Sequence, residues 1–380
     1  MKFLFSRFKT VFRVGYSGRT PQPSGGMDTW LFVALVVLSI FGVLMVYDAS
    51  VAIGIRDFHD QYYFAKEQIK WLLLGYCAFI FFSKLHYHRW YFWALPLLLV
   101  VFGLLLMVFI PGFGVRALGA HRWLNFGFFV LQPAEMAKLV LIVYLSAWFS
   151  TKEKDRFFAF LLLTGGFFGL VVLEPDLGTG IILAAISFTI YFLSGAPSRH
   201  FMFLIPVVVG GVMILAVASP YRFARITTFL NTERDPLGAS YQIRQVLLAL
   251  GSGGWFGVGP GKSRQKYEYL PEANTDSIFA IIGEELGFAG GATVVSLFAF
   301  ITWRGFRIAQ RAPDPFGKLL AGGIASWVGI QASMNLAAMV SLIPLTGIPL
   351  PLVSYGGSSL VITMTGLGVL MNISKYVKAT

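Results

Sequence analysis

Charge and cysteine are both scarce in this chain. Only 13% of its 380 residues are charged, and its single cysteine, Cys77, lies in an apolar run. A lone cysteine excludes an intramolecular disulfide framework. His86 and His88 share a short stretch with no third ligand nearby, which argues against a zinc site. We find no heptads, no repeat of fixed period, and no phosphate-binding or dinucleotide-binding glycine motif.

Hydrophobic residues, in contrast, are abundant. The chain is 56% hydrophobic and contains 37 Phe, which is typical of polytopic membrane proteins. A helix that spans a bilayer needs about 20 residues, and about ten stretches meet that criterion. They lie near 29–48, 67–83, 91–110, 131–149, 157–174, 177–194, 198–218, 276–303, 318–343 and 354–374. We therefore predict an all-α polytopic membrane protein with about ten transmembrane helices.

The basic residues predict the orientation. Residues 1–28 form a basic arm whose apolar run starts too late for a cleaved signal peptide, and 29–380 form one integral membrane domain. With the arm in the cytosol, most Lys and Arg of the short connections are cytosolic, as the positive-inside rule requires. An even number of spans then places the C-terminus in the cytosol. The net charge of +12 follows mostly from this topology, and no basic stripe with interleaved aromatics indicates nucleic acid.

One long connection, about 219–275 between the seventh and eighth predicted spans, falls on the extracytoplasmic side. Its basic residues outnumber its acidic ones. That excess runs against the topological bias, so it needs another explanation. Phosphate binding is one explanation. A loop held by its own ion pairs is the other, and both stay open.

The stretch Gly257–Gly287 is the most informative part of the chain. Its polar, glycine-rich first half is a predicted loop, and its second half is a predicted membrane helix. Asp276 lies where the two meet. Burying a carboxylate there costs free energy unless it is paired with a cation, hydrated or used in catalysis. The loop before it adds basic and acidic candidates: Lys262, Lys266, Glu268 and Glu272.

Other polar groups have structural as well as functional interpretations. Asp48 is favoured as a solvated helix end. Glu135 and Lys138 share a helix face and form either an internal ion pair or part of a site. Glu174 and Asp176 flank a tight turn that could bind a divalent cation, Mg or Mn, or hold arginines of the long loop, and we favour the arginines.

Two further features lie near the outer ends of predicted spans. For Glu285, in a glycine-flanked acidic pair, we favour a buried, hydrogen-bonded acid that holds helices together. Residues 344–359 contain three prolines and three glycines, which predict a re-entrant or irregular segment with hydroxyl donors such as Ser354 and Ser358. Gln331 and Asn335 form one polar face on the preceding helix.

Taken together, these motifs resemble the SEDS family (shape, elongation, division and sporulation proteins), whose members FtsW and RodA polymerise peptidoglycan. The resemblance covers nearly all of the chain after the basic arm. The SRQK and YLPEA motifs are closer to those of the division-type FtsW than to those of RodA. The chain departs from the family pattern at Asn274, where a His is common, and at Ser277, where a Phe is common. The motifs are RW at 122–123, QPxE…K at 132–138, EPDLGT at 174–179, GSGG at 251–254, SxQK at 263–266, LPEAxTDxIFAxxGEELG at 270–287 and PLxSYGGSS at 351–359.

The resemblance implies a glycosyltransferase at the outer face of the bacterial cytoplasmic membrane. Such enzymes join lipid II, an undecaprenyl-pyrophosphate-linked disaccharide pentapeptide, into β-1,4 glycan strands and release undecaprenyl pyrophosphate. The family's catalytic aspartate matches Asp276, and a second required acid matches Glu268. A class B penicillin-binding protein is the implied partner, and no cofactor is certain.

The residues around Asp276 fit that chemistry. A hydroxyl nucleophile needs a general base, and a departing diphosphate needs fixed cations. The expected substrate-binding residues are Lys138, Arg122, Lys262, Lys266, Glu135, Gln132, Glu174, Asp176, Glu272, Ser354 and Ser358. The main rival hypothesis is a lipid II flippase that uses the intramembrane charges as a polar pathway. A scaffold for a partner synthase is the third hypothesis, which leaves the pattern around Asp276 unexplained.

Overall fold

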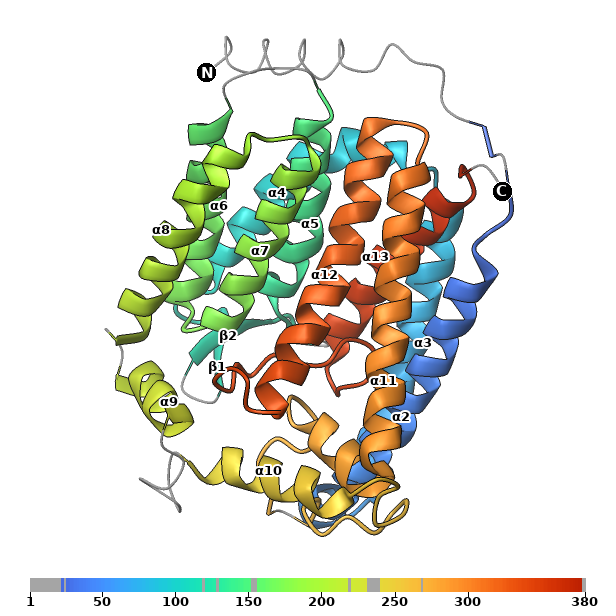
Figure 1. Ribbon diagram of the computed structural model, residues 1–380, viewed down its shortest axis with the longest axis vertical. Coiled ribbons are helices and arrows are strands. Elements are labelled where there is room, and N and C mark those ends of the chain that lie inside the picture. The colour runs from blue at the N-terminus through green and yellow to red at the C-terminus, as the bar shows by residue number, and fades with distance from the viewer. Residues whose placement is uncertain are drawn as a thin grey trace.

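The computed structural model describes residues 22–23, 25–117, 120–127, 130–151, 156–217, 220–230, 240–267 and 269–377, so most of the predicted basic arm lies outside the described residues. The described chain is mostly helical, as predicted (Figure 1). All of its long helices overlap stretches predicted to span a bilayer. Those of 17 residues or more are α2 (Thr29–Phe58), α3 (Tyr63–Lys84), α4 (His88–Met107), α5 (Pro133–Phe149), α6 (Phe157–Leu173), α7 (Leu177–Leu193), α8 (Ser198–Val217), α11 (Ile278–Arg311), α12 (Pro315–Met339) and α13 (Gly357–Ser374).

Length and composition alone qualify five helices of the described chain to cross a membrane. These are α2, α4, α11, α13 and the part Ser198–Leu215 of α8, while α6 and α7 are shorter apolar helices.

Aspartates fix the starts of several long helices. Asp28, Asp176 and Asp314 each accept a hydrogen bond of 2.9–3.0 Å from the N–H three residues later, at the starts of α2, α7 and α12. Such caps satisfy backbone donors that have no partner within the helix.

The connections contain structure that the sequence did not predict. The long connection includes two short helices, α9 (Pro220–Leu230) and α10 (Tyr241–Gly253). Between α4 and α5 lies an antiparallel sheet of β1 (Gly114–Ala117), β2 (Ala120–Asn125) and β3 (Val130–Leu131), in that order. The strictly all-α prediction is wrong here, because strands of two to six residues are too short for their alternation to be read from sequence.

The long helices form one bundle with two distinct ends (Figure 1). Both ends of the described chain meet at one of them, the terminal face. There the Gly25 N–H donates to the Lys375 carbonyl at 3.0 Å, and Asp28 pairs with Arg304 at 2.6 Å. The opposite end, the loop face, carries α9, α10, the sheet and the connection 254–277. Helix α12 packs against α5, α7, α11 and α13 and so reaches the core and the loop face.

Helix α11 is broken near the loop face. Gly287 has φ 66° and ψ −164°, and a Cβ at this position would lie 2.3 Å from the backbone nitrogen of Gly257. Residues 254–259 and 284–289 exchange four backbone hydrogen bonds of 2.9–3.1 Å across the break. The loop therefore satisfies groups that the helix loses, as non-helical backbone in a membrane bundle requires.

The segment predicted to be irregular at 344–359 is non-helical from 340 to 356. Most of its residues from 346 to 354 are buried, and the segment lies between the end of α12 and the start of α13. Three of its carbonyl groups accept hydrogen bonds from side chains of α9 and α12. This irregular segment is thus a wall of defined shape on the loop face.

Candidate active site

Asp276 lies in the turn 271–277 that leads into α11, where the sequence placed it. Three consecutive carbonyl groups of this turn, at 274, 275 and 276, are held from outside. They accept hydrogen bonds from the N–H of Tyr355 at 2.9 Å, Oγ of Ser354 at 2.5 Å and Nδ2 of Asn335 at 2.8 Å. The backbone of Asp276 is therefore fixed by the irregular segment and by α12.

The carboxylate of Asp276 is buried, with 8% of the residue exposed. Its Oδ1 accepts a hydrogen bond of 3.3 Å from Thr275 Oγ1. Burial, and then the negative charge of Glu272, raise the pKa of Asp276 to about 6, while Arg225 and Thr275 oppose the rise. An acid with this pKa is ionised at neutral pH yet remains a useful proton acceptor, which suits a general base.

Arg225 of α9 and Asp276 both lie close to Gly347. A Cβ on Gly347, whose φ is 68°, would lie 3.8 Å from Nη1 of Arg225 and 3.9 Å from Oδ2 of Asp276. The same guanidinium donates to the Leu345 carbonyl at 2.8 Å. A cation, a carboxylate and the irregular segment therefore meet at one point. A Cβ there would be in ordinary van der Waals contact with both charged groups, so the positive φ rather than a lack of space favours glycine.

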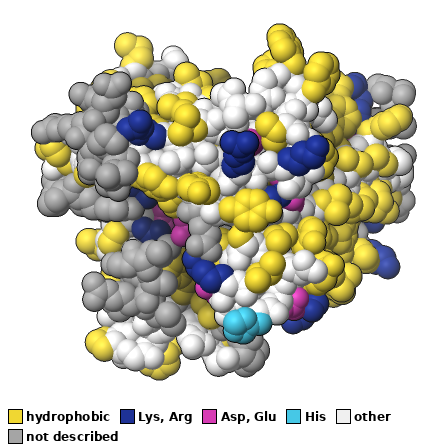
Figure 2. Space-filling model, turned by 90° about the horizontal axis from the view of Figure 1, so that it is seen from below, with side chains coloured by type: hydrophobic (Ala, Val, Ile, Leu, Met, Phe, Trp, Pro, Cys, Tyr) yellow, Lys and Arg dark blue, Asp and Glu magenta, His cyan; other side chains and the backbone are white. Residues whose placement is uncertain are grey.

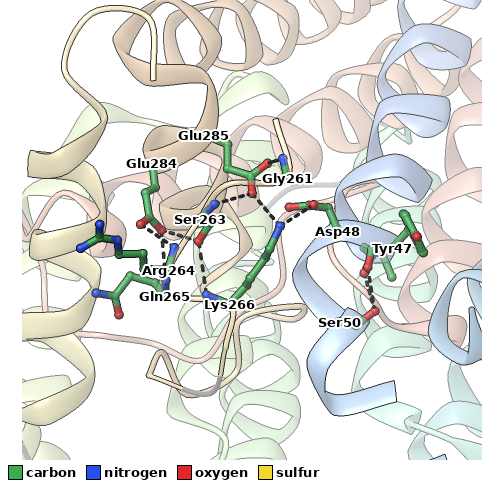
Figure 3. A network of polar contacts seen from close by, with 11 residues as sticks. Tyr47, Asp48, Ser50, Gly261, Ser263, Arg264, Gln265, Lys266, Glu284 and Glu285 are labelled. Atoms are coloured by element: carbon green, nitrogen blue, oxygen red, sulfur yellow. Dashed lines mark hydrogen bonds and ion pairs between the residues drawn. The ribbon is translucent and has the colours of Figure 1, made fainter. Parts of the chain in front are cut away.

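A second polar centre, the carboxylate cluster, comprises Asp48, Ser263, Lys266, Glu284 and Glu285 (Figure 3). Lys266 Nζ lies 2.8 Å from Asp48 Oδ1 and 3.0 Å from Glu285 Oε1. Four backbone N–H groups between 261 and 265 donate to the two glutamates at 2.8–3.4 Å, and Ser263 Oγ donates to Glu284. The cluster binds the loop 257–267 to α11 and α2.

The cluster settles two of the alternatives left open by the sequence. Glu285 is a buried, hydrogen-bonded acid, as favoured. The interpretation of Asp48 as a solvated helix end is wrong, because α2 continues to Phe58 and Asp48 pairs with Lys266. Burial lowers the pKa of Lys266, but its bonds to Asp48 and Glu285 outweigh burial and raise that pKa above the ordinary value.

Lys138 is buried among polar and aromatic side chains of α5 and α12. Its Nζ lies 2.7 Å from Glu135 Oε1 and 2.8 Å from Gln331 Oε1, and 5.4 Å from the centre of the Trp327 ring. Glu135 Oε2 has no hydrogen-bond partner within the described chain. This is the geometry of the internal ion pair considered above, and substrate binding by Lys138 and Glu135 stays a prediction.

The turn between α6 and α7 is tied to the sheet. Arg122 of β2 donates to the carbonyls of Glu174 and Pro175 at 3.1 and 2.6 Å, and Gln132 Nε2 lies 3.4 Å from Asp176 Oδ2. Burial, and then the charge of Asp176, raise the pKa of Glu174 to about 8, with Arg122 opposing. Among the described residues the arginine held by this turn is Arg122, not the favoured arginines of the long connection.

The remaining predicted residues are dispersed over the loop face. Lys262 is exposed, Glu272 accepts a hydrogen bond of 2.7 Å from Thr275 Oγ1, and Ser358 donates to the Val130 carbonyl at 3.0 Å. Glu268 lies outside the described residues. No group of three or more His, Cys, Asp or Glu within the described ranges could hold a metal ion. Figure 2 shows this face, where basic side chains lie beside acidic ones and hydrophobic side chains surround them.

The sequence pointed only weakly to the groups that complete the Asp276 site. Arg225 is one of several arginines in the long connection, and its spacing does not distinguish it. Asn335 carries a signal, since it shares a polar helix face with Gln331, but that pattern does not name its partners. Gly347 is one of three glycines in the irregular segment, and only its positive φ identifies it.

Comparison with known proteins places the chain among close relatives. The family described as cell cycle protein, of the FtsW, RodA and SpoVE type, matches residues 28–379. The chain is 41% identical over 355 residues to stage V sporulation protein E of Bacillus subtilis (strain 168), which covers 92% of this chain and 97% of the relative. It is 40% identical over 356 residues to a probable peptidoglycan glycosyltransferase FtsW of Geobacter sp. (strain M18), with the same two coverages of 92% and 97%.

The fold is also similar to a solved structure. One chain from a study of the structural coordination of polymerization and crosslinking by a peptidoglycan synthase complex superposes with a TM-score of 0.77 at 27% identity. The match covers 92% of this chain and 97% of that one. The likeness therefore extends over the whole described bundle rather than over a shared helix pair.

Proposed function

The chain belongs to the FtsW, RodA and SpoVE family of cell cycle proteins, and from that premise we propose that it is a peptidoglycan glycosyltransferase. Its substrate is lipid II, and its product is a β-1,4 glycan strand with release of undecaprenyl pyrophosphate. The observation that carries the assignment is the buried Asp276 carboxylate, set on a fixed backbone beside Arg225 at the loop face.

In the reaction, Asp276 takes the proton of the acceptor sugar's 4-hydroxyl. The hydroxyl oxygen attacks C1 of the donor sugar, a new C1–O4 bond forms, and the bond from C1 to the diphosphate oxygen breaks. The electron pair of that bond leaves with undecaprenyl pyrophosphate. A single displacement of this kind inverts the configuration at C1, from the α-linked donor to the β-linked glycan. Glu268 stays the predicted second acid.

Fixed cations must stabilise the departing diphosphate, and loss of one such group typically lowers the rate by about 10²–10³. We add Arg225 to the predicted phosphate ligands, since it lies near Gly347 as Asp276 does and its charge lowers the pKa of Asp276. Arg122 and Lys262 remain predicted ligands. Lys138 and Lys266 remain predicted ligands too, although both ammonium groups already bind carboxylates of the protein.

We further propose that the loop face lies outside the cytoplasmic membrane of a bacterium and the terminal face in the cytosol. About ten helices then cross the bilayer, and the Asp276 site lies on the periplasmic or outer side.

The family also suggests a partner. A solved neighbour belongs to a complex that couples polymerization and crosslinking, and a class B penicillin-binding protein is the corresponding partner for this chain. The flippase alternative is not favoured, because relatives are named as glycosyltransferases.

The direct test uses the purified full chain with a class B penicillin-binding protein and fluorescent lipid II. Wild-type protein is expected to form glycan polymer, and Asp276→Asn is expected to bind lipid II but form none. Asp57→Asn is the matched control, because it makes the same chemical change at an exposed acid. Asp57 lies at the end of α2 and pairs with its neighbour Arg56. Normal polymerisation by Asp276→Asn would remove the catalytic assignment, and lipid II translocation by wild type without any polymer would favour the flippase.

A further inference from the structure

Asn335 joins the two walls of the Asp276 site. It lies on α12 with 1% of the residue exposed, and its Nδ2 donates to the carbonyl of Asp276 and to the carbonyl of Ile348, each at 2.8 Å. One amide group therefore binds the turn that carries the carboxylate and the irregular segment that faces it. This side-chain bracket acts beside two direct bonds between the walls, from Ser354 Oγ to the Thr275 carbonyl and from the Tyr355 N–H to the Asn274 carbonyl. Of these three donors, Asn335 is the one that bonds the Asp276 carbonyl itself.

The Asp276 carbonyl needs such an external donor. A helix beginning here would direct the Ala280 N–H to the carbonyl at 276, but that N–H donates to Ser277 at 2.9 Å instead. A buried carbonyl without a donor costs about 1–3 kcal/mol. Asn335 supplies the donor, and the bond holds the peptide of Asp276 out of the regular path of α11.

The other wall is fixed in the same way. Gln331, one turn earlier on α12, donates from Nε2 to the Pro349 carbonyl at 3.0 Å, and Arg225 donates to Leu345. Only Asn335 among these three side chains also bonds the backbone of Asp276. Gln331 and Arg225 thus shape the irregular segment, whereas Asn335 relates that segment to the peptide of Asp276, next to the direct bonds from Ser354 and Tyr355.

We propose that Asn335 is a positioning residue of the glycosyl transfer: its amide sets the carboxylate of Asp276 at the distance from the irregular segment that the acceptor hydroxyl requires. The inference rests on the proposed function. Asn335 acts through Asp276 and does not touch the reacting atoms. A misplacement of about 1 Å can lower a rate by roughly 10²-fold without weakening substrate binding. The amide therefore acts on kcat rather than on KM.

Removal of the bracket should also change the pH profile. Among described residues, Asp276 is faced by Glu272 of its own turn and by Arg225 of α9. Without Asn335 the bonds from Ser354 and Tyr355 still hold the carbonyls at 275 and 274, but the peptide of Asp276 loses its donor. We expect the carboxylate to shift and to become more solvated, so that its pKa falls from about 6 toward its ordinary 3.8. The acid limb of the activity profile then moves to lower pH. A loss of folded protein would lower activity equally at every pH instead.

The experiment measures kcat, KM and the acid limb for Asn335→Ala in the full chain with its partner and fluorescent lipid II. We expect kcat to fall by about 10- to 100-fold, KM to stay within about threefold, and the acid limb to move to lower pH. Asn335→Leu, which keeps the same branching of the side chain but is larger and has no donor, should behave alike and serves if the alanine variant does not fold.

Asn372 provides the matched control. It is a buried asparagine of α13 at the terminal face, whose Nδ2 donates to Ser83 at 2.8 Å and whose Oδ1 accepts from the Tyr87 N–H at 2.9 Å. Asn372→Ala should lose comparable stability but keep kcat per folded molecule within twofold. Equal kcat losses in both variants, or an unchanged acid limb in the Asn335 variants, would overturn the positioning role. Absence of polymer from wild type would instead contradict the proposed function itself.

Discussion

Replacement of Lys266 by methionine decides between two roles for this lysine. As a phosphate ligand, Lys266 should affect substrate binding and leave stability nearly unchanged. As the counter-ion of the carboxylate cluster, it should affect stability first. The structure favours the second outcome, because the residue is 4% exposed and its ammonium contacts Asp48 and Glu285 at 2.8 and 3.0 Å.

The expected magnitude follows from these distances. Charges about 3 Å apart attract by about 5–6 kcal/mol at an effective dielectric constant of about 20, before desolvation is counted. Removing one partner of a buried pair costs about 3–5 kcal/mol in practice, because the other charge stays buried. Lys266→Met leaves two carboxylates without their cation, so we expect a loss of free energy of unfolding near the upper end of that range. Adding Asp48→Asn to the variant should restore part of the loss.

The assay is thermal unfolding of the purified protein in detergent, combined with the rate of polymer formation per folded molecule. Lys70→Met is the control, because Lys70 is 69% exposed and pairs with Glu67 on the surface of α3. Exposed pairs contribute about 0–1 kcal/mol, so the control should unfold near the wild-type temperature. A wild-type unfolding temperature for Lys266→Met, together with a raised KM for lipid II, would refute the structural role.

Three further predictions concern Arg225 and Gly347 near Asp276, and Glu174 in the turn between α6 and α7. Arg225→Ala should lower turnover of lipid II and move the acid limb of activity to higher pH, because loss of the cation raises the pKa of Asp276 above about 6. Gly347→Ala should lower kcat by roughly tenfold, because alanine is strained at a φ of 68° and a shift of the backbone there displaces the neighbours of Asp276. Gly112→Ala is also strained, at a φ of 96°, but has no neighbour within 4 Å and should leave kcat unchanged. Wild-type thermal stability should fall as pH rises from about 4.5 to about 8, because burial raises the pKa of Glu174 and favours its protonated form. Glu174→Gln should remove that slope in unfolding temperature against pH.

The sequence was sufficient where burial restricts the choices. A carboxylate at the entrance of an apolar helix has few stable environments, so the sequence alone placed Asp276 at the start of a long helix and made it the predicted base. The helical class follows from the long apolar stretches for the same reason. The irregular segment was also predictable, because the prolines and glycines between 344 and 359 do not support a membrane helix.

Partners distant in sequence could not be predicted. Asp48 and Lys266 are separated by 218 residues, and no spacing rule relates them. The solvated interpretation of Asp48 failed because α2 extends ten residues beyond its predicted end at 48, to Phe58. Arg225 lies in a connection rich in arginine, and only the position of α9 selects it. Each of these contacts depends on how the helices pack, which local pattern does not encode.

The first half of α11 links the two polar centres of the loop face. Asp276 precedes its start, where the positive end of the helix dipole favours a carboxylate, and Glu284 and Glu285 lie at its other end, about 12 Å away at 1.5 Å per residue. At that end the loop residues 258 and 259 donate to the carbonyls that the break at Gly287 leaves without helical partners. The half-helix, the loop and the turn of Asp276 are consequently bonded into one unit. The hydrogen bonds of the Asp276 carboxylate are local, from Thr275 Oγ1 at 3.3 Å and from the backbone at 276. Its position therefore depends on this unit and on the donors from Asn335, Ser354 and Tyr355 that hold the backbone of the turn.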